Sequence, residues 1–190
     1  MPQLVLASSS PRRRDLLARL GVAPVRVASP DIDENPCKGE VPRVYALRMA
    51  EEKAQAVTRG AGEIIIAGDT TVAVGRRILP QAADAEMQRG FLQLLSGRRH
   101  HVLSAVAVID ADGRLRSRIC DSIVRFKRLS DDEIQSYIDS GEGLGKAGGY
   151  AIQGRAESLI DWMAGSHSGV IGLPLYETRA LLRAAGYALG

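Results

Sequence analysis

The chain begins with a strand, a turn and a helix whose boundaries can be placed from the side chains alone. The apolar run from Leu4 to Ala7 predicts a strand, and the hydroxyl-rich turn after it ends in Ser10 and Pro11. Serine is favoured as the N-cap of a helix and proline at its first position, so a helix is predicted over residues 11–20. Such a unit is typical of folds in which helices pack on a sheet.

Three arginines, Arg12 to Arg14, occupy the first turn of this helix, where positive charge is unfavourable. A helix N-terminus carries about half a positive elementary charge and unpaired N–H groups, so first turns favour Asp and Glu. In a capping box the third helical position would be Glu or Gln, and here it is Arg13. The converging N–H groups, hydroxyls and guanidinium groups predict an anion site, with phosphate favoured. The alternative is a solvated basic turn in which one arginine pairs with Asp15.

The rest of the chain alternates between strands and helices, which predicts a single α/β domain over residues 1–190 with a mixed twisted sheet and flanking helices. Further strands are predicted over residues 24–28, 64–67, 72–74, 78–79, 102–109, 114–127, 150–153 and 158–163. Further helices are predicted over residues 42–58, 84–95, 130–140 and 173–185. Ser130 and Glu133 form a capping-box signature at the start of the third of these.

Composition excludes several functional classes. The 25 basic and 22 acidic side chains leave a net charge of +3, which is too weak for a bulk nucleic-acid binder. No apolar stretch approaches the roughly 20 residues that span a bilayer, so no membrane association is expected. Cys37 and Cys120 lie far apart without metal-ligand spacing, and the N-terminus lacks a signal-peptide pattern. Together these features indicate a cytoplasmic protein with free thiols.

A second group of candidate site residues combines acids with a lysine. Asp69 follows the buried strand predicted at 64–67, and ligands of open α/β sheets gather at the carboxyl ends of strands. Its carboxylate could bind a divalent metal or take a proton from water that attacks a phosphate. The acidic run from Asp31 to Glu34 offers further oxygen ligands, and Lys53 flanks the apolar stripe of the helix predicted over 42–58. The alternatives are ordinary turn chemistry at Asp69 and a solvated acidic loop. Taken with the anion site, these residues indicate phosphoryl transfer.

Other patterns are less specific. The loop from Gly143 to Gly148 matches G-x-G-x-x-G, but it follows a predicted helix and precedes a predicted strand, the reverse of a dinucleotide-binding unit. It either closes over a nucleotide through Lys146 or serves as a hinge. His100, His101 and His167 have no zinc-ligand spacing and are interpreted as solvent-facing loop residues.

The ordered set of motifs resembles the Maf nucleoside triphosphate pyrophosphatases over essentially the whole chain. The segment from Leu4 to Arg13 is similar to their opening signature. The resemblance continues through Asp33-Glu34, Ala50 to Ala54, Gly68-Asp69-Thr70, Leu95-Ser96-Gly97, Lys146-Ala147-Gly148, Tyr150 to Gly154 and Gly172 to Leu175. It implies a fold similar to the inosine triphosphatase-like proteins, with two lobes around a cleft. It also implies hydrolysis of a nucleoside triphosphate to the monophosphate and pyrophosphate, Mg²⁺ or Mn²⁺ as cofactor, and a homodimer.

The same resemblance implies roles for individual residues. Asp69 is the implied general base or water-positioning carboxylate, Glu34 and Asp69 are the implied metal ligands, and Lys53 completes the catalytic set. The nucleotide ligands that it implies are Ser8, Ser10, Arg13 and Lys53 for the triphosphate, with Lys146 and Gln153 on the other side. Arg12, Thr70 and Gln153 resemble the branch that acts on dTTP and UTP rather than on 7-methyl-GTP. A glutamine amide suits the imide edge of a pyrimidine because it offers both a donor and an acceptor.

Two departures from the family pattern bear on activity. Gln81 stands where the family usually has a lysine, and an amide brings no positive charge to a phosphate. Gly143 and Gly145 stand where the family tends to have Pro and Asp, which predicts a looser loop around Lys146. Gln81 supports the alternative of a non-catalytic or weakly active nucleotide-binding regulator of cell division. A third interpretation, nucleic-acid binding through the arginine turn, is disfavoured by the low net charge.

Overall fold

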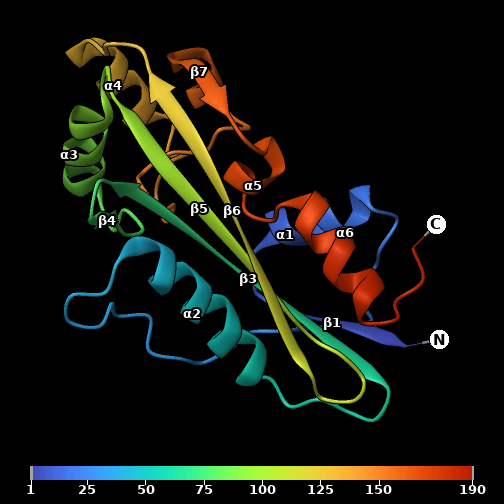
Figure 1. The fold of residues 1–190 in the computed structure, drawn as a ribbon. Helices are drawn as coiled ribbons and strands as arrows, with labels where there is room; N and C mark the ends of the chain where they lie inside the picture. The colour runs from blue at the N-terminus through green and yellow to red at the C-terminus, as the bar shows by residue number, and fades with distance from the viewer. Residues whose placement is uncertain (1, 190) are drawn as a thin grey trace.

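The computed structural model describes residues 2–189 and contains a mixed sheet of seven strands flanked by helices (Figure 1). The strands are β1 (Gln3–Ala7), β2 (Arg26–Ala28), β3 (Glu63–Val74), β4 (Arg77–Leu79), β5 (Arg99–Ile109), β6 (Leu115–Phe126) and β7 (Ile160–Ala164). The helices are α1 (Pro11–Arg19), α2 (Pro42–Gln55), α3 (Ala85–Leu95), α4 (Asp131–Asp139), α5 (His167–Ile171) and α6 (Leu175–Ala184), with a 3₁₀ turn, η1, at Arg155–Leu159. The predicted α/β class is confirmed.

The strands lie in the order β2-β1-β3-β5-β6-β7, and β4 pairs with the end of β3. β1 runs parallel to both β2 and β3, whereas β3, β5, β6 and β7 pair antiparallel. The long strands β3, β5 and β6 therefore extend well beyond the parallel part of the sheet. In Figure 1, α3 and α4 gather at one end of these strands, and α1 and α6 lie toward the other.

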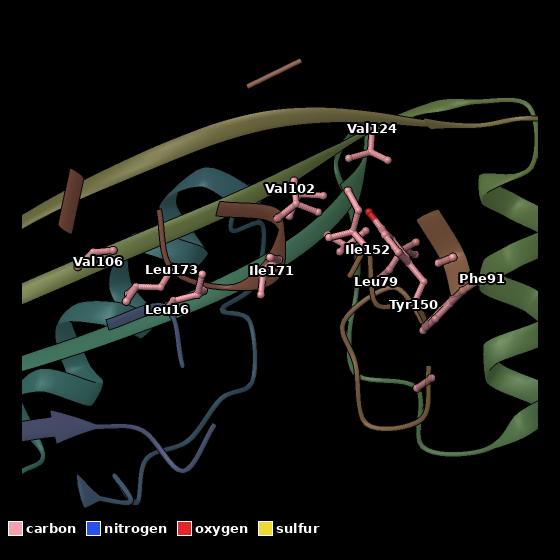
Figure 2. Close-up of a cluster of buried hydrophobic side chains, with 14 of the residues drawn as sticks. Leu16, Leu79, Phe91, Val102, Val106, Val124, Tyr150, Ile152, Ile171 and Leu173 are labelled. Atoms are coloured by element: carbon pink, nitrogen blue, oxygen red, sulfur yellow. The ribbon is translucent and has the colours of Figure 1, made fainter. Parts of the chain in front are cut away.

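Both faces of the sheet are covered. On one face, α2 presents Ala46, Ala50 and Ala54 to small side chains of β3 and β5 such as Ala67 and Ala105. Alanine against alanine lets the helix lie close to the strands, which brings the polar residues of α2 close to the sheet as well. The opposite face carries a larger cluster that extends from Leu16, Val106 and Leu173 to Leu79, Phe91 and Tyr150 (Figure 2). Each large apolar side chain buried there contributes roughly 1.5–3 kcal/mol.

The predicted position of Asp69 at the end of a strand is wrong, because β3 does not stop at Ala67. β1 ends at Ala7, opposite Ala67, but β3 continues to Val74 by pairing with β5 and then β4. Asp69 thus lies inside a strand, opposite Ala105. It still adjoins the edge of the parallel region, because the turn after β1 leaves the sheet at that point.

Three other predicted segments also differ from the structure. Residues 150–153 form no strand; Tyr150 and Ile152 are buried by packing of a turn rather than by strand pairing. The strand predicted over 158–163 is divided between η1 and β7. The last helix begins at Leu175 and is preceded by the short α5, which the sequence did not reveal. Within residues 2–189, no helix has the length and apolar character that crossing a lipid bilayer requires.

The interpretation of His100 as a solvent-facing residue is wrong. His100 lies in β5, is 1% exposed, stacks on Phe126 and shares a 2.7 Å hydrogen bond through Nε2 with the Tyr150 hydroxyl. Burial lowers the pKa of this imidazole to about 4, so it is neutral near pH 7. By contrast, His101 lies 2.8 Å from Asp121 at the surface, and the side chain of His167 is exposed at the start of α5.

Gly143 is tightly packed, which corrects the expectation that it loosens the glycine loop, whereas a Cβ at Gly145 would meet nothing within 4 Å. A Cβ atom at Gly143 would overlap the Gly149 carbonyl and the Gln88 amide. At Gly148, whose φ is +68°, a Cβ would lie 2.8 Å from a methyl group of Val72. The loop is therefore packed against Gln88 of α3 at Gly143 and against Val72 of β3 at Gly148, on either side of Lys146.

Candidate active site

The structure brings all the site residues predicted from the sequence to one cleft of about 350 Å³. They come from the turn after β1, the start of α1, the loop before α2, α2 itself, β3 and the segments after β4 and α4. The predicted residues that line the cleft are Ser8, Ser10, Arg12, Arg13, Glu34, Lys53, Asp69, Thr70, Gln81, Lys146 and Gln153. Four of these side chains are cationic and two are carboxylates.

Arg13 is held in the cleft by hydrogen bonds to the turn after β1 and to the main chain just after α5. Its Nη1 donates a 2.9 Å hydrogen bond to the Ser8 hydroxyl, and its Nε donates a 3.0 Å hydrogen bond to the Gly172 carbonyl. Gly68 makes room for this guanidinium, because a Cβ there would lie 3.3 Å from Arg13 Nε. Ser10 occupies the N-cap position of α1 as predicted, but its side chain makes no capping bond. The start of α1 therefore has N–H groups that a bound anion could use.

Positive charge at the start of α1 is incompletely balanced by the protein. Burial lowers the pKa of both the Arg12 and the Arg13 guanidinium groups. For Arg13, the negative charge of Asp69 opposes this effect, and the neighbouring Arg12 adds to it. An anion in the cleft would stabilise both charged forms.

Lys53 lies between the two carboxylates of the cleft. Its Nζ donates 2.9 Å hydrogen bonds to Glu34 Oε2 and to Asp69 Oδ1. The other Asp69 oxygen accepts a 2.9 Å hydrogen bond from the Thr71 hydroxyl. The side chains of Lys53 and Asp69 are each 9% exposed, whereas that of Glu34 is 49% exposed. Asp69 thus has both oxygens oriented by the protein, and Glu34 extends from solvent into the site.

The opposite wall consists of the glycine loop and the segment after β4. The Ala82 N–H donates to the Lys146 carbonyl over 3.1 Å, and the Gly145 N–H donates to the Ala82 carbonyl over 2.9 Å. This pairing sets Gln81 opposite Ala147, the residue after Lys146, and both Gln81 and Lys146 line the cleft. Burial lowers the pKa of the Lys146 ammonium, and the charge of Arg12 lowers it further. Cations from both walls therefore act on the same space.

The chain matches the family model described as "Maf-like protein" over residues 3–185. It belongs to the Maf family. A dTTP/UTP pyrophosphatase of Sphingopyxis alaskensis is 62% identical over 190 residues, which is 100% of both chains. A dTTP/UTP pyrophosphatase of Novosphingobium aromaticivorans is 62% identical over 186 residues, covering 97% of this chain and 92% of the relative. The Ham1 protein of Staphylococcus aureus has a similar fold, with a TM-score of 0.51, 12% identity and 96% of each chain covered.

Two residues that contact the predicted site residues of this Maf chain were not predicted from the sequence. Tyr45 donates a 2.8 Å hydrogen bond from its hydroxyl to the Glu34 carbonyl, and burial, with the charges of Asp69 and Glu34, raises its pKa to about 12. Its spacing of eight residues from Lys53 on α2 was the available signal, because such residues lie on one side of a helix. Gly172 binds Arg13 through its main-chain carbonyl, and no side-chain pattern could reveal that contact.

The carboxylates of Glu34 and Asp69 do not complete a divalent metal site by themselves. Among residues 2–189, no cluster of three or more His, Cys, Asp or Glu side chains is arranged to hold a metal ion. Glu34 and Asp69 are close enough for Lys53 to bind both. Mg²⁺ in nucleotide enzymes is commonly bound by one or two carboxylates, water and substrate phosphates. The donor set therefore fits a metal that enters with a nucleotide.

We expect Arg13→Lys to weaken the binding of inorganic tripolyphosphate about tenfold, because a lysine cannot hold Ser8 and Gly172 while also presenting a planar fork to phosphate. Isothermal titration calorimetry measures this affinity. Arg14→Lys is the matched control, since Arg14 is exposed and does not line the cleft. Equal affinities for both variants would show that Arg13 does not bind the anion.

Proposed function

We propose that this Maf chain hydrolyses nucleoside triphosphates to nucleoside monophosphate and pyrophosphate, with dTTP and UTP as favoured substrates. The observation that carries the proposal is the placement of Lys53 between Glu34 and Asp69 in a cleft that also receives Arg12, Arg13 and Lys146. The names of relatives that are 62% identical support the same activity and the same substrates.

The cations suit the triphosphate chain. Arg13, Lys53 and the N–H groups at the start of α1 lie near one another, whereas Lys146 faces them from the glycine loop. Charge accumulates on the phosphoryl oxygens and on the pyrophosphate leaving group during attack at the α-phosphate. Fixed cations in a partly buried cleft offset that charge with little reorganisation.

Asp69 is the proposed base. Thr71 and Lys53 bind its two oxygens, which fixes the carboxylate and leaves lone pairs on both oxygens for a water molecule. The water loses a proton to Asp69 and forms a bond to the α-phosphorus, and the bond from that phosphorus to the bridging oxygen breaks. Pyrophosphate leaves with the bonding electrons, stabilised by the adjacent cations.

The proposed cofactor is Mg²⁺ or Mn²⁺. Glu34 and Asp69 would hold the metal together with oxygens of the triphosphate. When bound, it would polarise the phosphoryl group and neutralise charge on the leaving pyrophosphate. Lys53 binds both carboxylates in the structure and would remain beside the metal as a further cation.

The proposed base-binding end combines an amide with apolar side chains. Gln153 and Thr70 line the cleft along with Val72, Val102 and Ile171. An amide can donate to a carbonyl oxygen and accept from the imide N–H of thymine or uracil. Apolar walls favour a flat base over bulk water. This arrangement supports pyrimidine nucleotides as substrates.

The proposal also covers the extent of the domain, its cellular compartment and its oligomeric state. We place the activity in one catalytic domain over residues 1–190 and in the cytoplasm, where the free thiols of Cys37 and Cys120 would stay reduced. A homodimer follows from the family resemblance alone and is kept as part of the proposal.

Incubation of the pure protein with a panel of nucleoside triphosphates and Mg²⁺ or Mn²⁺ tests the function. We expect monophosphate and pyrophosphate, fastest from dTTP and UTP. Asp69→Asn should lower kcat by about 10²–10⁴, since the amide cannot take the proton, while a non-hydrolysable dTTP analogue still binds. Asp112→Asn, at an exposed turn, is the control and should retain full activity. Release of diphosphate and orthophosphate would contradict the proposed cleavage position.

Gln81→Lys tests the alternative of a nucleotide-binding regulator. The new ammonium would face the cleft beside Lys146 and add a positive charge near the phosphates. We expect kcat/KM for dTTP to rise about 10–100-fold, by comparison with the loss of one oxyanion donor. Gln93→Lys adds the same charge at an exposed position of α3 and should change nothing. A wild type that binds nucleotide without turnover, and gains turnover only with Gln81→Lys, would favour the regulator.

A further inference from the structure

Glu34 is carried by a segment that has little structure of its own. Residues 29–41, here called the Glu34 segment, contain no helix or strand, and most of their side chains are exposed. Glu34 reaches the site through one 2.9 Å bond to Lys53 while its side chain stays 49% exposed. An irregular loop pays conformational entropy to hold one side chain in place, so it needs further anchors.

Two anchors to the main chain of this segment come from α2. The Tyr45 hydroxyl donates to the Glu34 carbonyl over 2.8 Å, and Arg48 Nη2 donates to the Asn35 carbonyl over 3.1 Å. Two successive carbonyls are therefore held by residues three positions apart on the helix that also supplies Lys53. The main chain of Glu34 and its carboxylate are thus both held by side chains of α2.

Glu40 completes the arrangement at the far end of the segment. Arg48 Nε and Nη2 donate 2.7 Å hydrogen bonds to the two carboxylate oxygens of Glu40, a bidentate pair. Glu40 Oε2 also accepts a 2.9 Å bond from the Cys37 N–H, and the Glu40 side chain is only 6% exposed. Hydrogen bonds from Arg48 lower the pKa of Glu40 to about 2. The pair is fully charged above pH 5 and would be lost only as pH falls toward 2.

We infer that Arg48 and Glu40 are positioning residues that hold Glu34 in the active site. Neither lines the cleft, so both act through the Glu34 segment rather than on substrate. The inference rests on the proposed function for its catalytic consequence. Its structural part, that Arg48 orders the segment, stands on the hydrogen bonds alone.

Hydrogen exchange measured by mass spectrometry tests the structural part in the full-length protein. Arg48→Met keeps the apolar stem and removes every donor. We expect the exchange rate to rise at least tenfold in peptides from residues 29–41, including at the Cys37 N–H, which donates a hydrogen bond to Glu40. Arg43→Met is the matched control on the same helix. The Arg43 side chain is 60% exposed, and its nearest carboxylate oxygen, on Asp121, lies 4.0 Å away, which is beyond hydrogen-bond distance. Unchanged exchange in Arg48→Met would overturn the inference.

A double-mutant cycle tests the catalytic part. We expect Arg48→Met and Glu34→Gln each to lower kcat/KM for dTTP by tenfold or more, and the double variant to be no worse than Glu34→Gln within about twofold. Losses that multiply would mean that Arg48 supports the enzyme by another route and would overturn the positioning role. Thermal unfolding checks that each variant is folded.

Two outcomes keep the inference separate from the proposed function. If the wild type hydrolysed no nucleotide, the proposed function would fail, whereas the exchange comparison would still decide whether Arg48 orders the segment. If Arg48→Met did not fold, Tyr45→Phe and Glu40→Gln would replace it, since each removes one anchor with little change of volume. Unchanged exchange in both would overturn the inference.

Discussion

The ammonium of Lys53 between Glu34 and Asp69 is the interaction on which the rest of the site depends. A buried cation is costly unless paired, and removing one member of a buried ion pair typically costs about 3–5 kcal/mol. Here the cation belongs to α2, one carboxylate to β3 and the other to an irregular segment. The same contact thus links three parts of the chain, and it keeps two acidic groups close together in the cleft that we propose binds a triphosphate.

The sheet explains why these groups meet at the start of α1. β1 ends opposite Ala67 while β3 continues, so the turn after β1 and the first residues of α1 lie beside Asp69. Gly68 leaves room for Arg13 to cross the strand and reach the Gly172 carbonyl. Close alanine packing brings α2 near enough for Lys53 to reach the same strand. The site therefore depends on strands and helices that pack closely together as well as on its polar side chains.

Local chemistry in the sequence predicted which residues gather in the cleft better than it predicted the packing around them. The misplaced charge of Arg13, the acid at Asp69 and the lysine flanking an apolar stripe are readable from neighbours along the chain, and all of them line the cleft. The failures concern non-local packing. His100 is polar but buried because Tyr150, distant in sequence, accepts or donates its hydrogen bond. Gly143 is small because Gly149 and Gln88 press on it, which no local pattern records. The anchors from Arg48 and Tyr45 are likewise contacts to main-chain carbonyls.

Hydrolysis of dTTP in water enriched in oxygen-18, followed by mass spectrometry of the products, tests the central claim most directly. If Asp69 directs water to the α-phosphorus, one oxygen-18 atom will appear in the monophosphate and none in the pyrophosphate. Label in pyrophosphate would mean attack at the β-phosphorus, and label in orthophosphate would mean attack at the γ-phosphorus. Either result would contradict the account of how this cleft works.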